Sequence, residues 1–354
     1  MDRYMALDTH DVSCTLGVMG SGGQKLGRQL VPTSAAALIA AVQAVRGRRH
    51  LVIEEGNLSA WLYETLVTYV DELVVVLPRK RQGSKSDEKD TWELADDLRL
   101  GRLDKRRVFK APQLFACLRA AVRAHRFLTH DVVRTKNRLR AVFRSRGLCQ
   151  TGDDLFDPEG RLVWLDRLPP AQRGLAQMLA LQLDELLSVH ERAEQALQEE
   201  AARHGIVRLL ATGPGMGPIR AATLVAVVLS PERFPSVRHF WSYCGLAIVT
   251  EASAEYEQDD DGRWERVKKP RPVGLNRNRH PWLKEVFKGA ANCVIGRMSG
   301  HHLHRHYERL LEGGTRPNLA RLTLARRIAS AELAMWKNKE AYDPEKHERQ
   351  ALRG

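Results

Sequence analysis

The sequence predicts a mixed α/β domain followed by mostly helical domains. Over residues 1–112, short strand-like runs alternate with helix-like runs, which is typical of a layered α/β domain. From residue 113 onward, apolar residues recur mainly at helical spacing. At 354 residues the chain is also longer than a single hydrophobic core usually serves, so we expect at least two domains.

The first elements are predicted to be two strands and a helix. Apolar residues alternate over residues 4–18, a glycine-rich turn follows at residues 20–23, and residues 24–31 resume the pattern, which indicates a hairpin. Ser34 is placed to cap an alanine-rich helix that runs to about Val45.

Two more strands with a helix between them complete the N-terminal domain. Residues 50–53 form a short apolar run that ends in Glu54 and Glu55. A helix is expected from Ser59 to about Val70, and residues 73–77 form a further β-branched run that Pro78 stops.

The rest of the chain is predicted to be helical. Residues 113–205 contain a basic helix up to about Gly147, then a loop, then a long helix over residues 171–204, and we expect these helices to pair as a coiled-coil hairpin. Residues 206–342 form a mostly helical C-terminal domain, and residues 343–354 are charged and apolar-poor, as in a flexible tail.

The composition favours a nucleic-acid partner. Lys and Arg number 56 against 43 Asp and Glu, a net charge of +13, and such an excess attracts polyanions. The 5 cysteines form no CxxC pair, which argues against a disulfide framework or a zinc knuckle. No run reaches the roughly 18 apolar residues of a membrane span, and the start lacks a signal pattern, so we expect a cytoplasmic protein without a membrane partner.

Acidic residues at strand ends and on a helix indicate a metal site. Asp8 lies inside the first apolar strand run, where a carboxylate needs a cation or a donor, and Glu54 and Glu55 end a second strand. Asp87 and Asp90 are three residues apart, hence on one face of a helix. Together they are suited to Mg²⁺ or Mn²⁺, although acidic residues also favour a helix N-terminus on their own.

A glycine-rich turn and clusters of basic residues are candidate nucleic-acid contacts. Gly215 and Gly217 precede a helix that begins near Pro218, as in a helix-hairpin-helix turn that holds a phosphate through backbone N–H groups, although a simple interhelix turn fits as well. The basic helix and an aromatic-rich loop, which could also be a solvated basic loop, supply the candidate side chains Arg134, Arg138, Lys268, Lys269, Arg271, Arg277 and Arg279.

Three blocks of the sequence resemble a known family. They are ALDTHD near the start, VIEEGNLSAWLYETL followed by KSDEKDTWELA, and LLATGPGMGP followed by FWSYCGLAIVTEAS. In this order they resemble the DEDD-type insertion-sequence transposases, which are related to the Piv/MooV-type DNA invertases and are known as bridge-RNA-guided recombinases. The resemblance spans almost the whole chain.

The resemblance implies a fold and a set of catalytic residues. The N-terminal domain would be RuvC-like (RNase H-like), with metal ligands at Asp8, Glu54 or Glu55, Asp87 and Asp90. Counting along the strand favours Glu54, whereas counting back from Trp61 favours Glu55, so both remain candidates.

Ser253 follows the family's GLAP-like block, which here continues as GLAIVTEAS. No GxSxG motif marks it as a nucleophile, and that role comes from the resemblance alone. Ile248 replaces the family's proline and Ala254 replaces its glycine.

The implied function is transposition or site-specific recombination of a mobile element through a phosphoserine intermediate. Donor and target DNA, a structured bridge RNA and further copies of the chain, as a dimer or tetramer, would be its partners. Two alternatives stay open: a RuvC-like structure-specific endonuclease that does not need Ser253, and a catalytically inactive nucleic-acid-binding protein.

Overall fold

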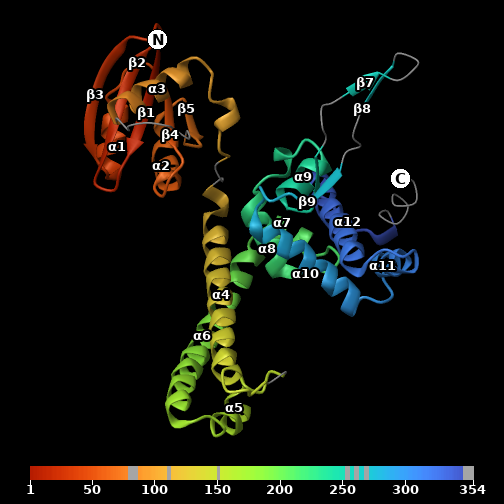
Figure 1. Cartoon of the computed structure of the whole chain (residues 1–354). Coiled ribbons are helices and arrows are strands. Elements are labelled where there is room, and N and C mark those ends of the chain that lie inside the picture. The colour runs from red at the N-terminus through yellow and green to blue at the C-terminus, as the bar shows by residue number, and fades with distance from the viewer. Residues whose placement is uncertain are drawn as a thin grey trace. The chain divides into compact units, whose positions relative to one another are not determined.

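A computed structural model of the chain divides it into two compact units, residues 1–113 and residues 114–354. Figure 1 shows their elements, and each unit is described by itself. The described residues are 1–78, 87–109, 113–149, 152–251, 256–258, 263–266 and 271–345, with the backbone alone at 87–90, 113, 251, 265–266 and 271–272.

The first unit contains a mixed sheet of the strands β1 (Asp2–Thr9), β2 (Ser13–Gly20), β3 (Lys25–Pro32), β4 (Arg48–Glu54) and β5 (Glu72–Val76). The strand order is β3-β2-β1-β4-β5. Strands β1, β2 and β3 pair antiparallel, whereas β4 is parallel to β1 and β5 is parallel to β4. This mixed α/β topology is consistent with the expected RNase H-like domain.

The predicted opening hairpin was wrong in one respect, because residues 4–18 form two strands rather than one. The chain reverses at residues 10–12, where the Thr33 hydroxyl donates to the His10 carbonyl at 2.8 Å and the Thr33 N–H donates to the Val12 carbonyl at 3.0 Å. This turn lacks the glycine or proline that would have marked it. The turn after β2 does contain glycine, and Gly23 has a φ of 86°.

Helices cover both faces of the sheet. The helices α1 (Ala35–Gln43) and α2 (Ser59–Leu66) pack on one face, where Leu7, Leu38, Ile53 and Leu62 share a core. Ser34 caps α1 as predicted, since its hydroxyl accepts from the Ala37 N–H. The helix α3 (Asp87–Arg99) covers the opposite face. The core on that side includes Ala6, Val52, Val74, Leu94 and Leu98.

The second unit begins with an antiparallel helical hairpin. The helices α4 (Ala116–Arg144) and α6 (Pro170–Ala202) pack along their lengths: Leu118 shares a core with Leu197 near one end, and Phe143 shares another with Ala176 near the other. The connection was expected to be a loop, but it contains the helix α5 (Pro158–Leu165), which Asp157 caps. Figure 1 shows α4 and α6 side by side.

The remaining helices form the largest core of the chain. They are α7 (Gly205–Leu210), α8 (Gly217–Val228), α9 (Val237–Tyr243), α10 (Pro281–Arg297), α11 (His302–Glu312) and α12 (Pro317–Asn338). Between α9 and α10, β6 (Ile248–Glu251) pairs with β9 (Arg271–Leu275), and β7 (Tyr256–Gln258) pairs with β8 (Trp264–Arg266). Among the described residues, no helix has the length and apolarity to cross a membrane.

Candidate active site

Two carboxylates lie side by side at the carboxyl ends of β1 and β4. In the parallel pairing of these strands Leu7 is the register partner of Ile53, so the next residues along the two strands are Asp8 and Glu54. Side chains alternate between the faces of a strand, and Ala6 and Val52, two residues earlier, both belong to the core under α3. Asp8 and Glu54 therefore occupy the α3 face of two adjacent strands.

Asp8 is only partly satisfied by the protein. Its side chain is about 25% exposed, and its Oδ2 is buried without a hydrogen-bond partner in the described part of the chain. The Nε2 of His10 lies 3.3 Å from this oxygen, close enough for ionic attraction when the imidazole is protonated. A buried carboxylate oxygen without a donor is costly, and a bound cation removes that cost.

Glu54 is held by an arginine from the end of the unit. The Nη2 of Arg106 donates to Glu54 Oε1 at 3.1 Å and to the Leu77 carbonyl at 2.7 Å. The Nη1 of the same guanidinium lies 3.7 Å from the buried carboxylate of Asp97. Arg106 thus fixes the direction of the Glu54 carboxylate, and its place beside the site gave no signal in the sequence.

The direction of α3 follows from two contacts with β2 and the turn after it. Gly17 in β2, the register partner of Ala6, lies against Thr91, since a Cβ at Gly17 would stand 2.7 Å from Thr91 Cγ2. Gly23, in the turn after β2, lies against the guanidinium of Arg99. The helix α3 therefore runs antiparallel to β1. Thr91 lies at the level of Ala6, and Arg99 lies near the amino end of β1.

This direction places the first turn of α3 at the end of the sheet that carries Asp8. Asp87 and Asp90 precede Thr91 in α3, and Asp8 follows Ala6 in β1. Because the two elements run in opposite directions, these residues lie at the same end of the sheet. The side chains of Asp87 and Asp90 lie outside the described residues, so only the placement of their backbone is known. All of the predicted acidic positions are thus carried by elements that meet at one edge.

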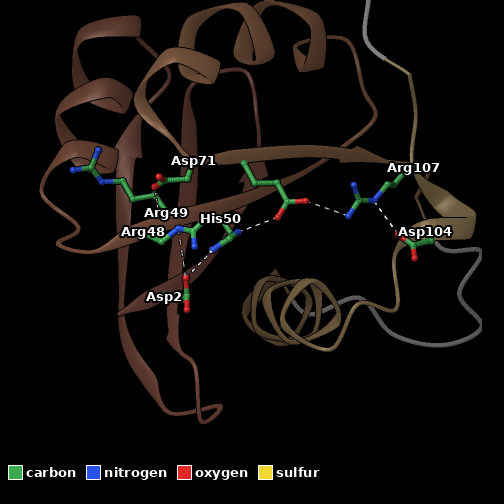
Figure 2. A network of polar contacts seen from close by, with 8 residues as sticks. Asp2, Arg48, Arg49, His50, Asp71, Asp104 and Arg107 are labelled. Atoms are coloured by element: carbon green, nitrogen blue, oxygen red, sulfur yellow. Dashed lines mark hydrogen bonds and ion pairs between the residues drawn. The ribbon is translucent and has the colours of Figure 1, made fainter. Parts of the chain in front are cut away.

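The opposite end of the sheet carries charges that are paired with one another (Figure 2). His50 hydrogen-bonds through Nε2 to Asp2 at 3.2 Å and through Nδ1 to Glu72 at 2.9 Å. Arg107, whose backbone pairs with Val76 at the other end of β5, reaches Glu72 at 3.2 Å and Asp104 at 3.1 Å. The hydrogen bond from His50 lowers the pKa of Asp2 below its usual value.

The predicted nucleic-acid contacts occupy several elements of the second unit. Arg134 and Arg138 are exposed one turn apart on α4, and Arg134 also lies 3.5 Å from Asp131. Arg277 is exposed after β9, whereas Arg279 packs over Gly245. Lys268 and Lys269 lie outside the described residues, as does the side chain of Arg271.

The two glycines of the predicted phosphate-binding turn differ in their surroundings. Gly215 has a φ of 71°, and a Cβ there would stand 2.4 Å from the Ala290 carbonyl of α10. Gly217 has a φ of 58° at the start of α8, with nothing within 4 Å of its Cβ position. Gly215 is therefore required by packing, whereas the positive φ of Gly217, rather than a close contact, favours glycine at the start of α8.

Ser253, the predicted nucleophile, lies outside the described residues. The strand β6, which ends at Glu251, leads directly into it, and β6 is paired with β9. The structure therefore gives the position of the preceding strand within the second unit and no contact of the serine itself.

Sequence comparisons match most of the chain to known transposases. Residues 5–146 match the family of IS110-type DEDD transposases, and residues 207–308 match the Transposase IS116/IS110/IS902 family. The insertion element IS116 uncharacterized 44.8 kDa protein of Streptomyces clavuligerus is 24% identical over 383 residues, covering 91% of each chain.

These matches, with the mixed sheet and its acidic edge, define a transposase of the DEDD type. The chain belongs to the IS116/IS110/IS902 family of insertion-sequence transposases. Enzymes of this kind act on DNA, and DEDD transposases typically use divalent metal ions.

Proposed function

We propose that this protein cleaves and rejoins DNA strands at the ends of an insertion element, with its metal site at the carboxyl ends of β1 and β4. The observation that carries the proposal is the adjacency of Asp8 and Glu54 on the α3 face, together with the buried Oδ2 of Asp8, which accepts no hydrogen bond from the described residues. Asp87 and Asp90, in the first turn of α3, would complete the ligand set.

The donor set fits hard divalent cations. Every proposed ligand is a carboxylate, and all-oxygen sites favour Mg²⁺ or Mn²⁺. Such ions, when bound, supply positive charge that stabilises the attacking and leaving oxygens of a phosphoryl transfer. Arg106 holds the Glu54 carboxylate in position at 3.1 Å, and the aspartates of the α3 first turn would approach from the helix side.

Glu54 is a better ligand candidate than Glu55. The side chain of Glu54 shares the α3 face with Asp8, as the core assignments of Val52 and Ala6 indicate. Glu55 continues the ladder, since its N–H donates to the Val76 carbonyl at 2.8 Å, and alternation therefore directs its side chain toward the opposite face, where Ile53 packs.

Ser253 is proposed as the nucleophile on the strength of the GLAIVTEAS block. Its Oγ would attack the scissile phosphorus and form an Oγ–P bond while the P–O bond to the departing strand breaks. The serine proton leaves to a base, and the departing sugar oxygen is protonated to a hydroxyl. This phosphoserine linkage separates a recombinase from a hydrolytic endonuclease, in which water takes the place of the serine.

Denaturing gel analysis of labelled element-end DNA tests this proposal. Purified full-length protein is incubated with Mg²⁺, the RNA encoded beside the element and the DNA. A protein-linked band that is lost in Ser253→Ala and kept in the exposed control Ser299→Ala supports the phosphoserine step. Cleavage without such a band favours a RuvC-like endonuclease, and binding without cleavage favours an inactive nucleic-acid-binding protein.

A structured bridge RNA is proposed to choose the DNA sequences, with the chain as a dimer or tetramer. The supports are the resemblance, the net charge of +13 and the exposed Arg134, Arg138 and Arg277. Exposed arginines hold phosphates without reading bases, which suits recognition of RNA shape. Replacing the RNA with a scrambled one should abolish cleavage of the matched DNA, and unchanged cleavage would contradict RNA guidance.

A further inference from the structure

Two histidines and a glutamate come together inside the α4/α6 hairpin of the second unit. His125 belongs to α4, and His190 and Glu194 lie one turn apart on α6. One potential ligand atom from each of the three lies within 4.8 Å of the other two. All three side chains are partly buried, which limits competition from bulk water.

The spacing of these atoms is close to that of a metal site. The Nε2 of His125 lies 3.8 Å from the Oε2 of Glu194, which is beyond hydrogen-bonding distance, and the two imidazole centroids are 4.8 Å apart. Zinc ligands at about 2.0–2.2 Å from the ion are about 3.4 Å from one another in a tetrahedron. A small inward movement of the side chains would therefore close the site.

Thr129 orients one of the two imidazoles. Its hydroxyl donates to the His125 carbonyl at 2.8 Å and lies 3.0 Å from the Nε2 of His190. Because a hydroxyl has a single proton, Thr129 is left to accept from a protonated Nε2 of His190. The Nδ1 of His190 then carries the free lone pair, as in sites where an outer partner fixes the tautomer of a metal-binding histidine.

The surroundings of His125 favour its neutral form. Burial, and then the neighbouring His190, lower the pKa of His125 below its usual value, although Glu194 acts in the opposite direction. Arg126, the nearest cation on α4, is paired with Glu285 and stacks on Trp282 at 4.8 Å. His125 also lines a pocket of about 170 Å³ that residues of α8 and α10 complete.

We propose that His125, His190 and Glu194 form a binding site for a transition-metal ion of the zinc type, which cross-links α4 to α6. Two imidazoles and one carboxylate favour Zn²⁺ or Co²⁺ over Mg²⁺, in contrast to the all-oxygen edge of the first unit. An ion held by both helices would stabilise the hairpin in the folded chain and would have no preformed site in the unfolded chain. The proposal is independent of the catalytic role of the first unit.

Titration of the full-length protein with Co²⁺, in excess Mg²⁺ to occupy the carboxylate edge, tests the site. We expect visible absorption bands at one equivalent of Co²⁺, without the strong near-ultraviolet band of thiolate ligands, and a higher Tm with Zn²⁺. His190→Ala should lose the bands and the Tm shift, whereas the exposed His130→Ala on α4 should keep both.

A second variant guards against loss of folding. Thr129→Val retains all three ligands but no longer orients His190, and it should weaken Co²⁺ affinity by about 10- to 100-fold, as is usual for changes in an outer shell. Equal binding by wild type, His190→Ala and Thr129→Val, or the absence of any Co²⁺ or Zn²⁺ binding by the folded wild type, would overturn the proposal.

Discussion

The two ends of the N-terminal sheet carry acidic residues in opposite circumstances. At the amino end, Asp2 and Glu72 are both hydrogen-bonded to His50, and Glu72 is also bonded to Arg107 (Figure 2). At the carboxyl end, Asp8 keeps a buried oxygen without a hydrogen bond in the described part of the chain. The carboxylates of the first set are hydrogen-bonded within the protein, whereas Asp8 has only the ionic contact with His10 at 3.3 Å and can accept a further cation.

The hydrogen bonding of each carboxylate therefore distinguishes structural from candidate catalytic residues in the same sheet. Carboxylates that already accept hydrogen bonds from the protein contribute modestly to stability. Carboxylates at strand ends that lack such hydrogen bonds are suited to binding a catalytic cation. Arg106 at Glu54 is the intermediate case, because it positions a carboxylate without covering both of its oxygens.

Loss of Asp8 is the strongest test of the comparison. Asp8→Asn should reduce metal-dependent DNA cleavage by more than about 100-fold, above the range of outer-shell changes, because it removes a ligand charge. Stability should change little, since the buried oxygen accepts no hydrogen bond from the described residues and loses only the contact with the half-exposed His10. Gel-based cleavage and thermal melting measure the two effects.

The exposed Asp11, in the turn after β1, is the matched control for Asp8. The Asp11→Asn variant should cleave DNA at the wild-type rate. Equal loss in both variants would assign the defect to the loop rather than to the strand end.

An ion pair in the second unit sharpens the contrast, because its buried cation is held by a carboxylate partner. The guanidinium of Arg161 on α5 is nearly buried and contacts both oxygens of Asp184 on α6 at 2.7 Å. Asp184→Asn leaves that cation without its counterion and should cost about 3 kcal/mol in the free energy of unfolding. Arg161→Met should cost less, because Asp184 is about 38% exposed and can be hydrated.

Urea unfolding monitored by circular dichroism gives both values. A larger cost for Arg161→Met than for Asp184→Asn would contradict the view that the buried partner dominates this pair.

Glu332 on α12 shows that an unpartnered carboxyl group need not be a catalytic one. Its two oxygens lack hydrogen-bond partners among the described residues, and a Cβ at Gly213 would stand 1.7 Å from one of them. Burial raises the pKa of Glu332 well above its usual value, which favours the protonated, neutral form in the folded chain. In contrast to Asp8, it is fully buried and lies inside a helix rather than at a strand end.

This raised pKa has a defined consequence for stability. Above the ordinary value of 4.5 the unfolded chain releases the proton that the folded chain keeps, so stability falls as pH rises toward the folded pKa, by about 1.4 kcal/mol per pH unit. Glu332→Gln removes this dependence. The Tm of the variant relative to wild type should therefore increase between pH 5 and pH 8 on the order of several degrees, and a constant difference would contradict a neutral Glu332.

The smallest effect is expected at the paired end of the sheet. Glu72→Gln removes a half-exposed carboxylate from the network with His50 and Arg107, and it should cost no more than about 1 kcal/mol while DNA cleavage stays unchanged. Cleavage that falls with this variant would break the distinction between the two ends.

Much of the first unit could be predicted from sequence because its signals are local. Alternating apolar residues indicated β1 and β2, and Ser34 indicated the start of α1. The turn at residues 10–12 has no glycine or proline, so the sequence concealed the break between β1 and β2. The helix α5 was missed because it is short and lies in a segment with glycine and proline.

The candidate site was predictable only in part, because its geometry depends on contacts distant in sequence. The order of Asp8, the glutamate pair and the α3 aspartates along the chain indicated a site, but the register of β1 with β4 was needed to favour Glu54. Arg106 reaches Glu54 across 52 residues and no local pattern marks it. His190 and Glu194 are four residues apart, so both lie on one face of α6, and this spacing was the local sign of the α4/α6 cluster.

Glu54 is the most direct test of the proposed metal site, because its adjacency to Asp8 defines that site. The measurement is Mn²⁺- or Mg²⁺-dependent cleavage of element-end DNA by Glu54→Gln and Glu55→Gln, with folding checked by circular dichroism. We predict that cleavage is lost in Glu54→Gln and retained in Glu55→Gln, because only Glu54 shares the α3 face with Asp8. Loss in Glu55→Gln alone would contradict the face assignment, and normal cleavage by both variants would contradict the site itself.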